Sequence, residues 1–156
     1  MIYRKANIKD AKEVDSLLTK LIADERQYDP KCELVIVKDY YINFIEDSNK
    51  YLFVCEDNNN IVGYIYSIIE EDNAKIDALF VLEEYRNKGI ATKLIEDFIS
   101  YAKDNNIKQI TINVLSNNLK ARKLYLKYFK PYKKENNKET LLLKVICLWK
   151  TIKNNC

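Results

Sequence analysis

The stretch from Ile76 to Ile95 constrains the fold of this chain more than any other part of it. It reads as a buried strand, a short polar turn and the first turns of an amphipathic helix. Only two glycines occur in the 156 residues, and one of them, Gly89, stands where the turn becomes the helix. A glycine at this place predicts that another group approaches the backbone closely. Because a helix start has unpaired N–H groups and the positive end of the helix dipole, we expect this loop to bind a phosphate or pyrophosphate.

The length and apolar content of the chain predict one folded unit. Its 156 residues fit a single domain, since domains typically contain about 100–200 residues. We expect this domain to span residues 1–156, with residues 148–156 as a C-terminal extension. No apolar run approaches the roughly 20 residues that cross a bilayer, and the first five residues lack a signal-peptide core. The sequence therefore predicts a cytoplasmic protein without a membrane partner.

Charge and cysteine content argue against several classes of function. The chain has 26 basic and 23 acidic residues, and its net charge of +3 is too small to predict nucleic-acid binding. It contains no histidine, and none of its four cysteines belongs to a C-x-x-C pair. These features argue against a structural zinc site and against a Cys-His nucleophile, so we expect no metal.

Hydrophobic periodicity predicts two helices before the first hairpin. A strand at residues 2–6 precedes a helix that Asn7 or Asp10 caps. Residues 24–30 end this helix, because the residue before a proline is disfavoured in the helical conformation. A polar loop follows, and residues 38–47 are predicted to form a second, short helix.

The rest of the chain alternates between strand and helix patterns. Residues 51–55 and 61–69 are rich in aromatic and β-branched residues and flank a turn sequence, which predicts a β-hairpin. The later predicted elements are a strand at 75–82, a helix at 88–104, a strand at 107–115, a helix at 118–129, and a hairpin of residues 130–135 and 139–146 that turns at Asn136-Asn137. The strand at 107–115 should run parallel to the strand at 75–82, because a helix connects them.

Two sequence patterns resemble those of a known family. Arg86-x-x-Gly89-x-Ala91 resembles the acyl-coenzyme A loop of the GNAT superfamily of N-acetyltransferases, which is usually written Q/R-x-x-G-x-G/A. The stretch Asn118-x-x-Ala121-x-x-Leu124-Tyr125 resembles the other recurring pattern of that family. The order of the predicted elements agrees with the family as well.

The resemblance implies an α/β (α+β) fold, in which a single GNAT-type domain has a mixed, mostly antiparallel central sheet flanked by helices. Two positions depart from the family pattern. Ala91 replaces the commoner glycine, and Tyr128-Phe129 stands where family members usually carry Gly-Phe. The second departure affects the exit of the later helix and leaves the phosphate loop unchanged.

The same resemblance implies acetyl-coenzyme A as a co-substrate, bound in a wedge where the strands at 75–82 and 107–115 splay apart. Its pyrophosphate would lie on the loop amides, and its pantetheine arm would pair with strand backbone as an added strand does. Asn118 would contact the cofactor or its water shell; the alternative is a helix cap, which asparagine also favours. The cofactor-binding candidates are Leu79, Phe80, Val81, Arg86, Asn87, Lys88, Gly89, Ile90, Ala91, Thr92 and Asn118.

The implied reaction moves an acetyl group to a primary amine by direct attack, without a covalent enzyme intermediate. Tyr125 resembles the family's general acid, which protonates the departing thiolate; the alternative is a tyrosine that only packs. A thiol of pKa ~8.5 and a phenol of pKa ~10 are close enough for such a transfer. The acceptor would be a small-molecule amine or a peptide amine. Two alternatives stay open, namely acetylation of a protein N-terminus or lysine, and a non-catalytic sensor of acyl-coenzyme A.

Since the chain has no histidine, a carboxylate or a chain of waters must take the proton from the amine. Asp77 is the best candidate, and the period of two in strands predicts that its side chain shares a face with Leu79 and Val81. Carboxylates after the first helix are expected to attract a cationic acceptor, and a tyrosine to wall the pocket; these residues are Glu25, Tyr28, Asp29 and Glu33. The alternative is that all these carboxylates are solvated surface charges.

The end of the chain carries two large apolar residues beyond the last predicted strand, Trp149 and Ile152. Such residues commonly pack against a partner subunit, which predicts a homodimer. The alternative is a tail that folds onto its own domain.

Overall fold

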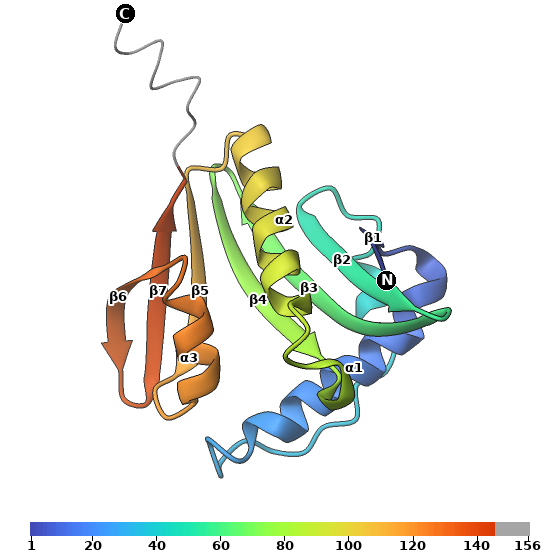
Figure 1. Ribbon diagram of the computed structural model, residues 1–156, viewed down its shortest axis with the longest axis horizontal. Helices are drawn as coiled ribbons and strands as arrows, with labels where there is room; N and C mark the ends of the chain where they lie inside the picture. The colour runs from blue at the N-terminus through green and yellow to red at the C-terminus, as the bar shows by residue number, and fades with distance from the viewer. Residues whose placement is uncertain (146–156) are drawn as a thin grey trace, which may run out of the picture.

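The protein is built on one seven-stranded sheet, seen in a computed structural model that describes residues 1–145 (Figure 1). The strands lie in the order β1-β2-β3-β4-β5-β7-β6. Their bounds are β1 Ile2–Lys5, β2 Lys50–Asp57, β3 Asn60–Glu70, β4 Asn73–Val81, β5 Gln109–Leu115, β6 Lys130–Glu135 and β7 Lys138–Lys144. Neighbouring strands are antiparallel except β4 and β5, whose predicted parallel pairing is confirmed.

Helices cover both faces of this sheet. The α-helices of the described range are α1 Ala11–Glu25, α2 Ile90–Asp104 and α3 Leu119–Tyr125, and the short 3₁₀ helices are η1 Ile8–Asp10, η2 Tyr41–Asn43 and η3 Glu83–Tyr85. α2 crosses one face of β3 and β4, and α1 lies on the opposite face (Figure 1). Each of these two helices therefore packs on its own apolar cluster.

The cluster under α2 follows from the periodicity of that helix. Ile90, Leu94, Ile95, Phe98 and Ala102 recur at helical spacing, and all five are at most 1% exposed. On the other face, α1 packs against a group of aromatic side chains from η2 and β3, which are Tyr41, Tyr64 and Tyr66. The hydroxyl groups of Tyr41 and Tyr64 lie 3.2 Å apart, which gives these buried polar atoms a partner.

Asparagine shapes the tight turns of the sheet. Asp57 and Asn60 pair across the β2–β3 hairpin, so its two-residue loop is Asn58-Asn59, with φ of 50° and 65°. A two-residue hairpin turn of this kind needs positive φ at both positions, which asparagine tolerates better than most residues. The β6–β7 hairpin turns at Asn136, with φ of 53°, as the sequence predicted.

The predicted helix at residues 38–47 is largely wrong. Only η2 is helical there, because the carboxylate of Asp15 in α1 accepts the N–H groups of Tyr40 and Tyr41 at 3.2 and 3.0 Å. Asp39, immediately before them, has a left-handed φ of 54° that no α-helix contains. Tertiary hydrogen bonds thus replace the helical ladder that the periodicity favoured.

The predicted helix at residues 118–129 is shorter than expected. α3 ends at Tyr125, and the N–H groups of Tyr128 and Phe129 both donate to the carbonyl of Tyr125. This tight turn carries Phe129 into the core, where it is 2% exposed. Burial of Phe129 therefore ends the helix four residues earlier than the sequence predicted.

A wedge separates the two halves of the sheet. β4 and β5 are paired only from Asn73 and Gln109 to Ile76 and Ile112. Both strands continue beyond this ladder without pairing to each other, and they diverge toward the lower end of the molecule (Figure 1). The fold thus leaves one edge of β4 open inside the sheet.

Residues 146–156 lie outside the described residues, and so do Trp149, Ile152 and the predictions of an extension and a dimer that rest on them. Within residues 1–145, every helix is too short or too polar to traverse a bilayer.

Candidate active site

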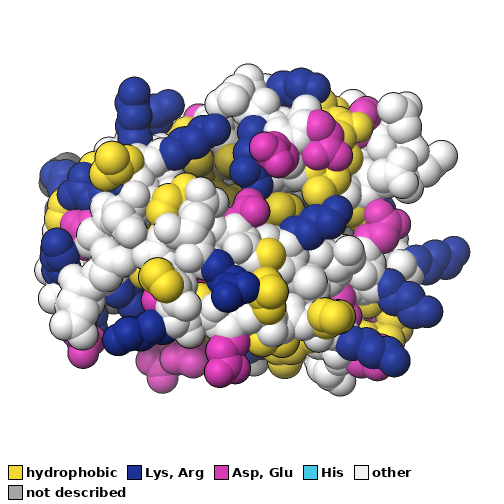
Figure 2. All heavy atoms as spheres, turned by 90° about the horizontal axis from the view of Figure 1, so that it is seen from below, with side chains coloured by type: hydrophobic (Ala, Val, Ile, Leu, Met, Phe, Trp, Pro, Cys, Tyr) yellow, Lys and Arg dark blue, Asp and Glu magenta, His cyan; other side chains and the backbone are white. Residues whose placement is uncertain are grey.

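The wedge between β4 and β5 contains a cavity of about 910 Å³. The end of α1, the C-terminal half of β4, the loop before α2, the end of β5 and α3 supply its walls. Seen from below, this face of the molecule is hollowed, and basic and acidic side chains lie around the recess (Figure 2). Apolar side chains therefore line the interior of the cavity, and charged side chains surround its opening.

The loop before α2 has the geometry of an anion site. Asn87 and Gly89 adopt left-handed φ values of 61° and 81°. The first hydrogen bond of α2 runs from the N–H of Lys93 to the carbonyl of Gly89, so the N–H groups of the first three helical residues have no partner within the helix. A Cβ on Gly89 would meet no atom within 4 Å, which shows open space in front of the loop. This arrangement fits a phosphate group.

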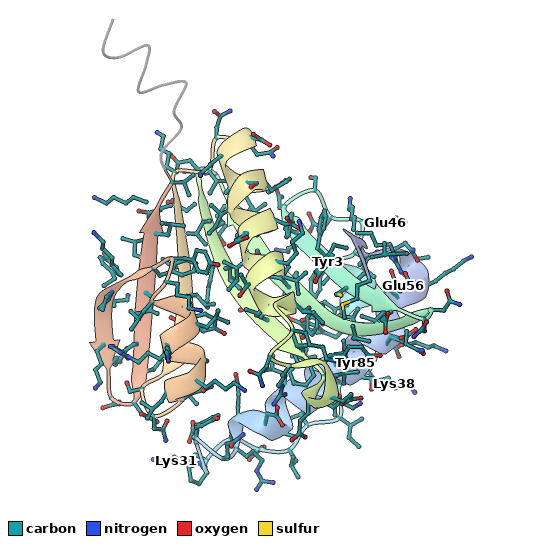
Figure 3. All side chains as sticks on the ribbon, viewed as in Figure 1. Tyr3, Lys31, Lys38, Glu46, Glu56 and Tyr85 are labelled. Atoms are coloured by element: carbon teal, nitrogen blue, oxygen red, sulfur yellow. The ribbon has the colours of Figure 1, made fainter. Side chains whose placement is uncertain are left out.

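The two cations of the loop direct their side chains elsewhere. Arg86 bonds to Val81 and Asp24, and the amino group of Lys88 lies 5.0 Å from the ring centre of Tyr85. Arg86, Asn87 and Gly89 line the cavity, whereas the predicted cofactor-binding residue Lys88 lies outside its lining. Tyr85 and Lys31, which follow β4 and α1 respectively, lie at the same lower end of the molecule (Figure 3).

The free edge of β4 offers backbone groups to the cavity. The N–H of Leu82 donates to Val62 of β3, and Phe80 pairs with Tyr64, so these positions direct their backbone groups toward β3. Because N–H and C=O groups alternate in direction along a strand, those of Leu79 and Val81 point toward the wedge. Of the three predicted strand candidates, Leu79 and Val81 thus have outward-facing amides, whereas Phe80 lines the cavity only with other atoms.

A β-bulge corrects the prediction for Asp77. On β3, the consecutive residues Tyr66 and Ser67 pair with Ala78 and Ile76, which leaves Asp77 as the extra residue. Ile76 packs on the α2 side and Ala78 on the α1 side, so the alternation changes phase at this point. The prediction that Asp77 shares a face with Leu79 is therefore wrong. Its side chain lies on the α1 side, where its charge raises the pKa values of Tyr41 and Tyr64 after the larger effect of burial.

The α1 side of the cavity is acidic. Glu25, Asp29 and Asp77 all line it, and Tyr28 lies between the first two in sequence. Burial first, and then the charges of Asp29 and Asp77, raise the pKa of Glu25. The carboxyl of Asp77 is 36% exposed and lies 3.8 Å from the amino group of Lys75. Glu33, in contrast, is exposed and lies outside the lining of the cavity.

Tyr125 completes the cavity from the opposite wall. It is the last residue of α3, it is half-buried, and it lines the same cavity as Glu25. Burial raises its pKa to about 12, and the charge of Glu25 adds to that shift. The structure therefore brings together the two side chains that the sequence assigned to separate roles.

Asn118 caps α3. Its Oδ1 accepts the N–H of Ala121 at 3.2 Å, so the capping alternative describes this contact. The residue also lines the cavity, and within residues 1–145 the N–H of Ala121 is the partner found for its side chain.

Sequence reasoning missed a bridge across the mouth of the wedge. The side-chain amides of Asn117 and Asn137 both donate to the carbonyl of Tyr28, at 2.9 and 3.4 Å, and Asn137 also donates to Oδ1 of Asn117 at 3.1 Å. These bonds join residues that are 89 and 109 positions apart. No local sequence signal predicts such contacts, because exposed asparagines in turns are common.

Comparison with known proteins identifies the family. The profile of the Acetyltransferase (GNAT) family matches residues 16–129. The chain belongs to this family. The crystal structure of PaiA N-acetyltransferase from Thermoplasma acidophilum in complex with coenzyme A has the same GNAT fold, with a TM-score of 0.73 at 17% identity over 92% of this chain and 98% of that chain. The predicted fold class is thereby confirmed.

Two curated relatives are similar in sequence over part of their length. A protein from Archaeoglobus fulgidus described as an uncharacterized N-acetyltransferase is 32% identical over 96 residues, which cover 57% of this chain and 65% of that protein. An N-alpha-acetyltransferase from Saccharolobus solfataricus is 37% identical over 103 residues, which cover 56% of this chain and 62% of that protein. The match thus spans less than two thirds of each relative.

Proposed function

We propose that this protein transfers an acetyl group from acetyl-coenzyme A to a primary amine by direct attack. One observation carries the proposal: the open edge of β4 runs directly into a loop of unpaired amides, inside a cavity that also contains Tyr125 and Asp77. Strand-like pairing suits the amide-containing pantetheine arm, and the helix start suits the pyrophosphate. The same cavity thus holds a site for the donor and ionisable groups for the chemistry.

The acceptor enters from the α1 side as an ammonium ion. Asp77, with Glu25 beside it, attracts this cation and accepts one of its protons. The amine nitrogen then attacks the thioester carbonyl carbon, and a backbone N–H on the edge of β4 stabilises the oxyanion. Collapse of the tetrahedral intermediate breaks the C–S bond and the thiolate leaves, while the nitrogen releases its second proton to water. Asp77 and the open edge lie on the same bulged stretch of β4, which supports this order of events.

Tyr125 donates a hydrogen bond, and then its proton, to the leaving thiolate. With a pKa of about 12 in the free protein, Tyr125 is fully protonated at neutral pH. Complete transfer to a thiolate of pKa ~8.5 is uphill in that state. A cationic acceptor beside Glu25 offsets the negative charge that helps to raise this pKa, so binding of the amine makes Tyr125 a better acid.

A peptide N-terminus is the second candidate acceptor. The loop between α1 and η2 exposes three consecutive apolar side chains, Leu34, Val35 and Ile36, which are 65%, 48% and 88% exposed. A polypeptide has side chains to cover such a strip, whereas a small polyamine has none.

Release of free thiol from acetyl-coenzyme A by the purified protein tests the proposal. The acceptor panel contains polyamines, aminoglycosides, amino acids and peptides. We expect amine-dependent thiol release with at least one class, and mass spectrometry of that acceptor should show one added acetyl group. Tight coenzyme A binding without turnover on any amine would instead favour a sensor.

A further inference from the structure

Arg86 joins the phosphate loop to the end of α1. Its Nε donates to the carbonyl of Val81 at 2.9 Å, and its Nη2 donates to Oδ2 of Asp24 at 2.6 Å. Its guanidinium carbon also lies 5.4 Å from the ring centre of Phe80. Three contacts therefore hold the side chain against the protein, although its backbone begins the loop that faces the cavity.

The partner of Arg86 belongs to the opposite side of the cavity. Asp24 lies in the last turn of α1 and directly precedes Glu25, and the two residues of the ion pair are 62 positions apart in sequence. The loop serves the donor, and the end of α1 serves the acceptor. One ion pair thus connects the two halves of the reaction.

The position of this pair matters more than its strength. The side chains of Arg86 and Asp24 are 32% and 42% exposed, and ion pairs at such sites contribute little to folding stability. The bond from Nε to Val81, however, fixes one outward-facing carbonyl on the free edge of β4. Movement of the loop must therefore shift the strand edge, Asp24 and Glu25 together.

We propose that Asp24 and Arg86 form a positioning pair that couples the donor loop to the acceptor carboxylates. Occupation of the loop by coenzyme A stabilises the existing contacts of Arg86 with Val81 and Asp24, and these contacts hold the end of α1 and place Glu25 for the amine. By reciprocity, an amine bound at Glu25 strengthens binding of the donor. The proposal rests on the proposed function of the cavity and adds a positioning residue, Asp24, whose carboxylate is paired with Arg86.

Hydrogen–deuterium exchange of residues 20–33, with and without saturating coenzyme A, tests the coupling without a known acceptor. In the wild-type protein, coenzyme A should slow exchange in this segment about five-fold or more, the lower range of typical coupling between sites. Asp24→Asn should bind coenzyme A in calorimetry but lose this protection, and Asp24→Glu should restore most of it. Asp72→Asn is the matched control, because Asp72 pairs with Lys108 and is also 42% exposed.

Full protection of residues 20–33 in Asp24→Asn would overturn the coupling, and so would wild-type protein that binds coenzyme A without protecting this segment. Wild-type protein that does not bind coenzyme A at all would instead overturn the proposed function. The two failures are therefore distinguished by calorimetry on the same samples.

Discussion

The two walls of the cavity present different parts of the chain to their ligands. The wall formed by β4 and the loop before α2 offers backbone groups, namely the outward amides of Leu79 and Val81 and the N–H groups at the helix start. The side facing α1 offers side chains, chiefly Glu25 and Asp29 at and after the end of α1 and Asp77, which β4 directs toward α1. Backbone donors persist when side chains are substituted, whereas carboxylates do not. Under the proposed function the first is the donor wall and the second the acceptor wall, so donor binding would depend on backbone groups and acceptor binding on a few replaceable side chains.

The largest expected effect belongs to Tyr125→Phe. Loss of the hydroxyl removes a group that acts in the transition state, so kcat should fall by roughly 10²–10⁴-fold. The affinity for acetyl-coenzyme A, measured by calorimetry, should stay nearly unchanged, because the donor wall is intact. Tyr128→Phe is the control: its hydroxyl donates to Glu96 on the outer surface at 2.9 Å, and its loss should leave turnover as in the wild type. Equal rates in both variants would assign Tyr125 to packing.

Asp77→Asn should lower kcat/KM with the best acceptor of the panel by about 10²-fold. It should also move the acid limb of the pH profile to lower pH. The sign follows from the charge on Asp77, which helps to raise the pKa of Glu25; without it, that pKa falls and Glu25 stays ionised in more acidic solution. Asp72→Asn should shift nothing. A wild-type pH profile in Asp77→Asn would show that this carboxylate does not act on the acceptor.

Gly89→Val should weaken coenzyme A binding and leave the acceptor side of the cavity unchanged. The left-handed conformation at φ of 81° is disfavoured for a β-branched residue by about 1–2 kcal/mol or more, so the free loop changes conformation. Binding must restore the original conformation at that cost, so the Kd for coenzyme A should rise about ten-fold or more in calorimetry. Gly89→Asn separates strain from obstruction, because asparagine accepts positive φ but still places a side chain before the amides. We expect a smaller loss with asparagine than with valine. Unchanged affinity in a folded Gly89→Val protein would show that the loop does not bind the phosphates.

The smallest effect is expected for Asn117→Ala, which removes the 2.9 Å bond to the carbonyl of Tyr28. One neutral hydrogen bond contributes about 0.5–1.5 kcal/mol, so the KM for the acceptor should rise a few-fold. The Kd for coenzyme A should remain that of the wild type. A change in the Kd alone would place the bridge on the donor side instead.

The sequence predicted the strand, loop and helix of the donor wall well, because these elements depend on local features. A strand pattern, a glycine at a helix start and the periodicity of α2 all lie within twenty residues, and β4, the loop and α2 follow one another in the structure as predicted. Because one helix connects β4 to β5, the sequence also predicted that these two strands pair in parallel, and this pairing is observed.

The acceptor wall was harder to predict because it depends on distant contacts. The bulge that turns Asp77 toward α1 exists only in the register between β3 and β4, and alternation within a single strand does not reveal it. The helix predicted at residues 38–47 was wrong for a similar reason, since the carboxylate of Asp15 in α1 accepts backbone N–H groups of this segment. The bridge at Tyr28 likewise joins segments about a hundred residues apart in the chain.

The asparagine residues in tight turns show why the glycine at position 89 needs a separate explanation. Residues with positive φ include Asn58, Asn59, Asn106 and Asn136, so this chain repeatedly uses asparagine where many proteins use glycine. Such a choice restricts the unfolded chain, and replacing a glycine at a compatible site typically lowers the entropy lost on folding by roughly 0.4–1 kcal/mol. A chain that can form left-handed turns with asparagine has no need of glycine for its backbone angle alone. Under the proposed function Gly89 matters for the side chain that it lacks, because a side chain there would enter the open space in front of the loop that the donor phosphates are proposed to occupy.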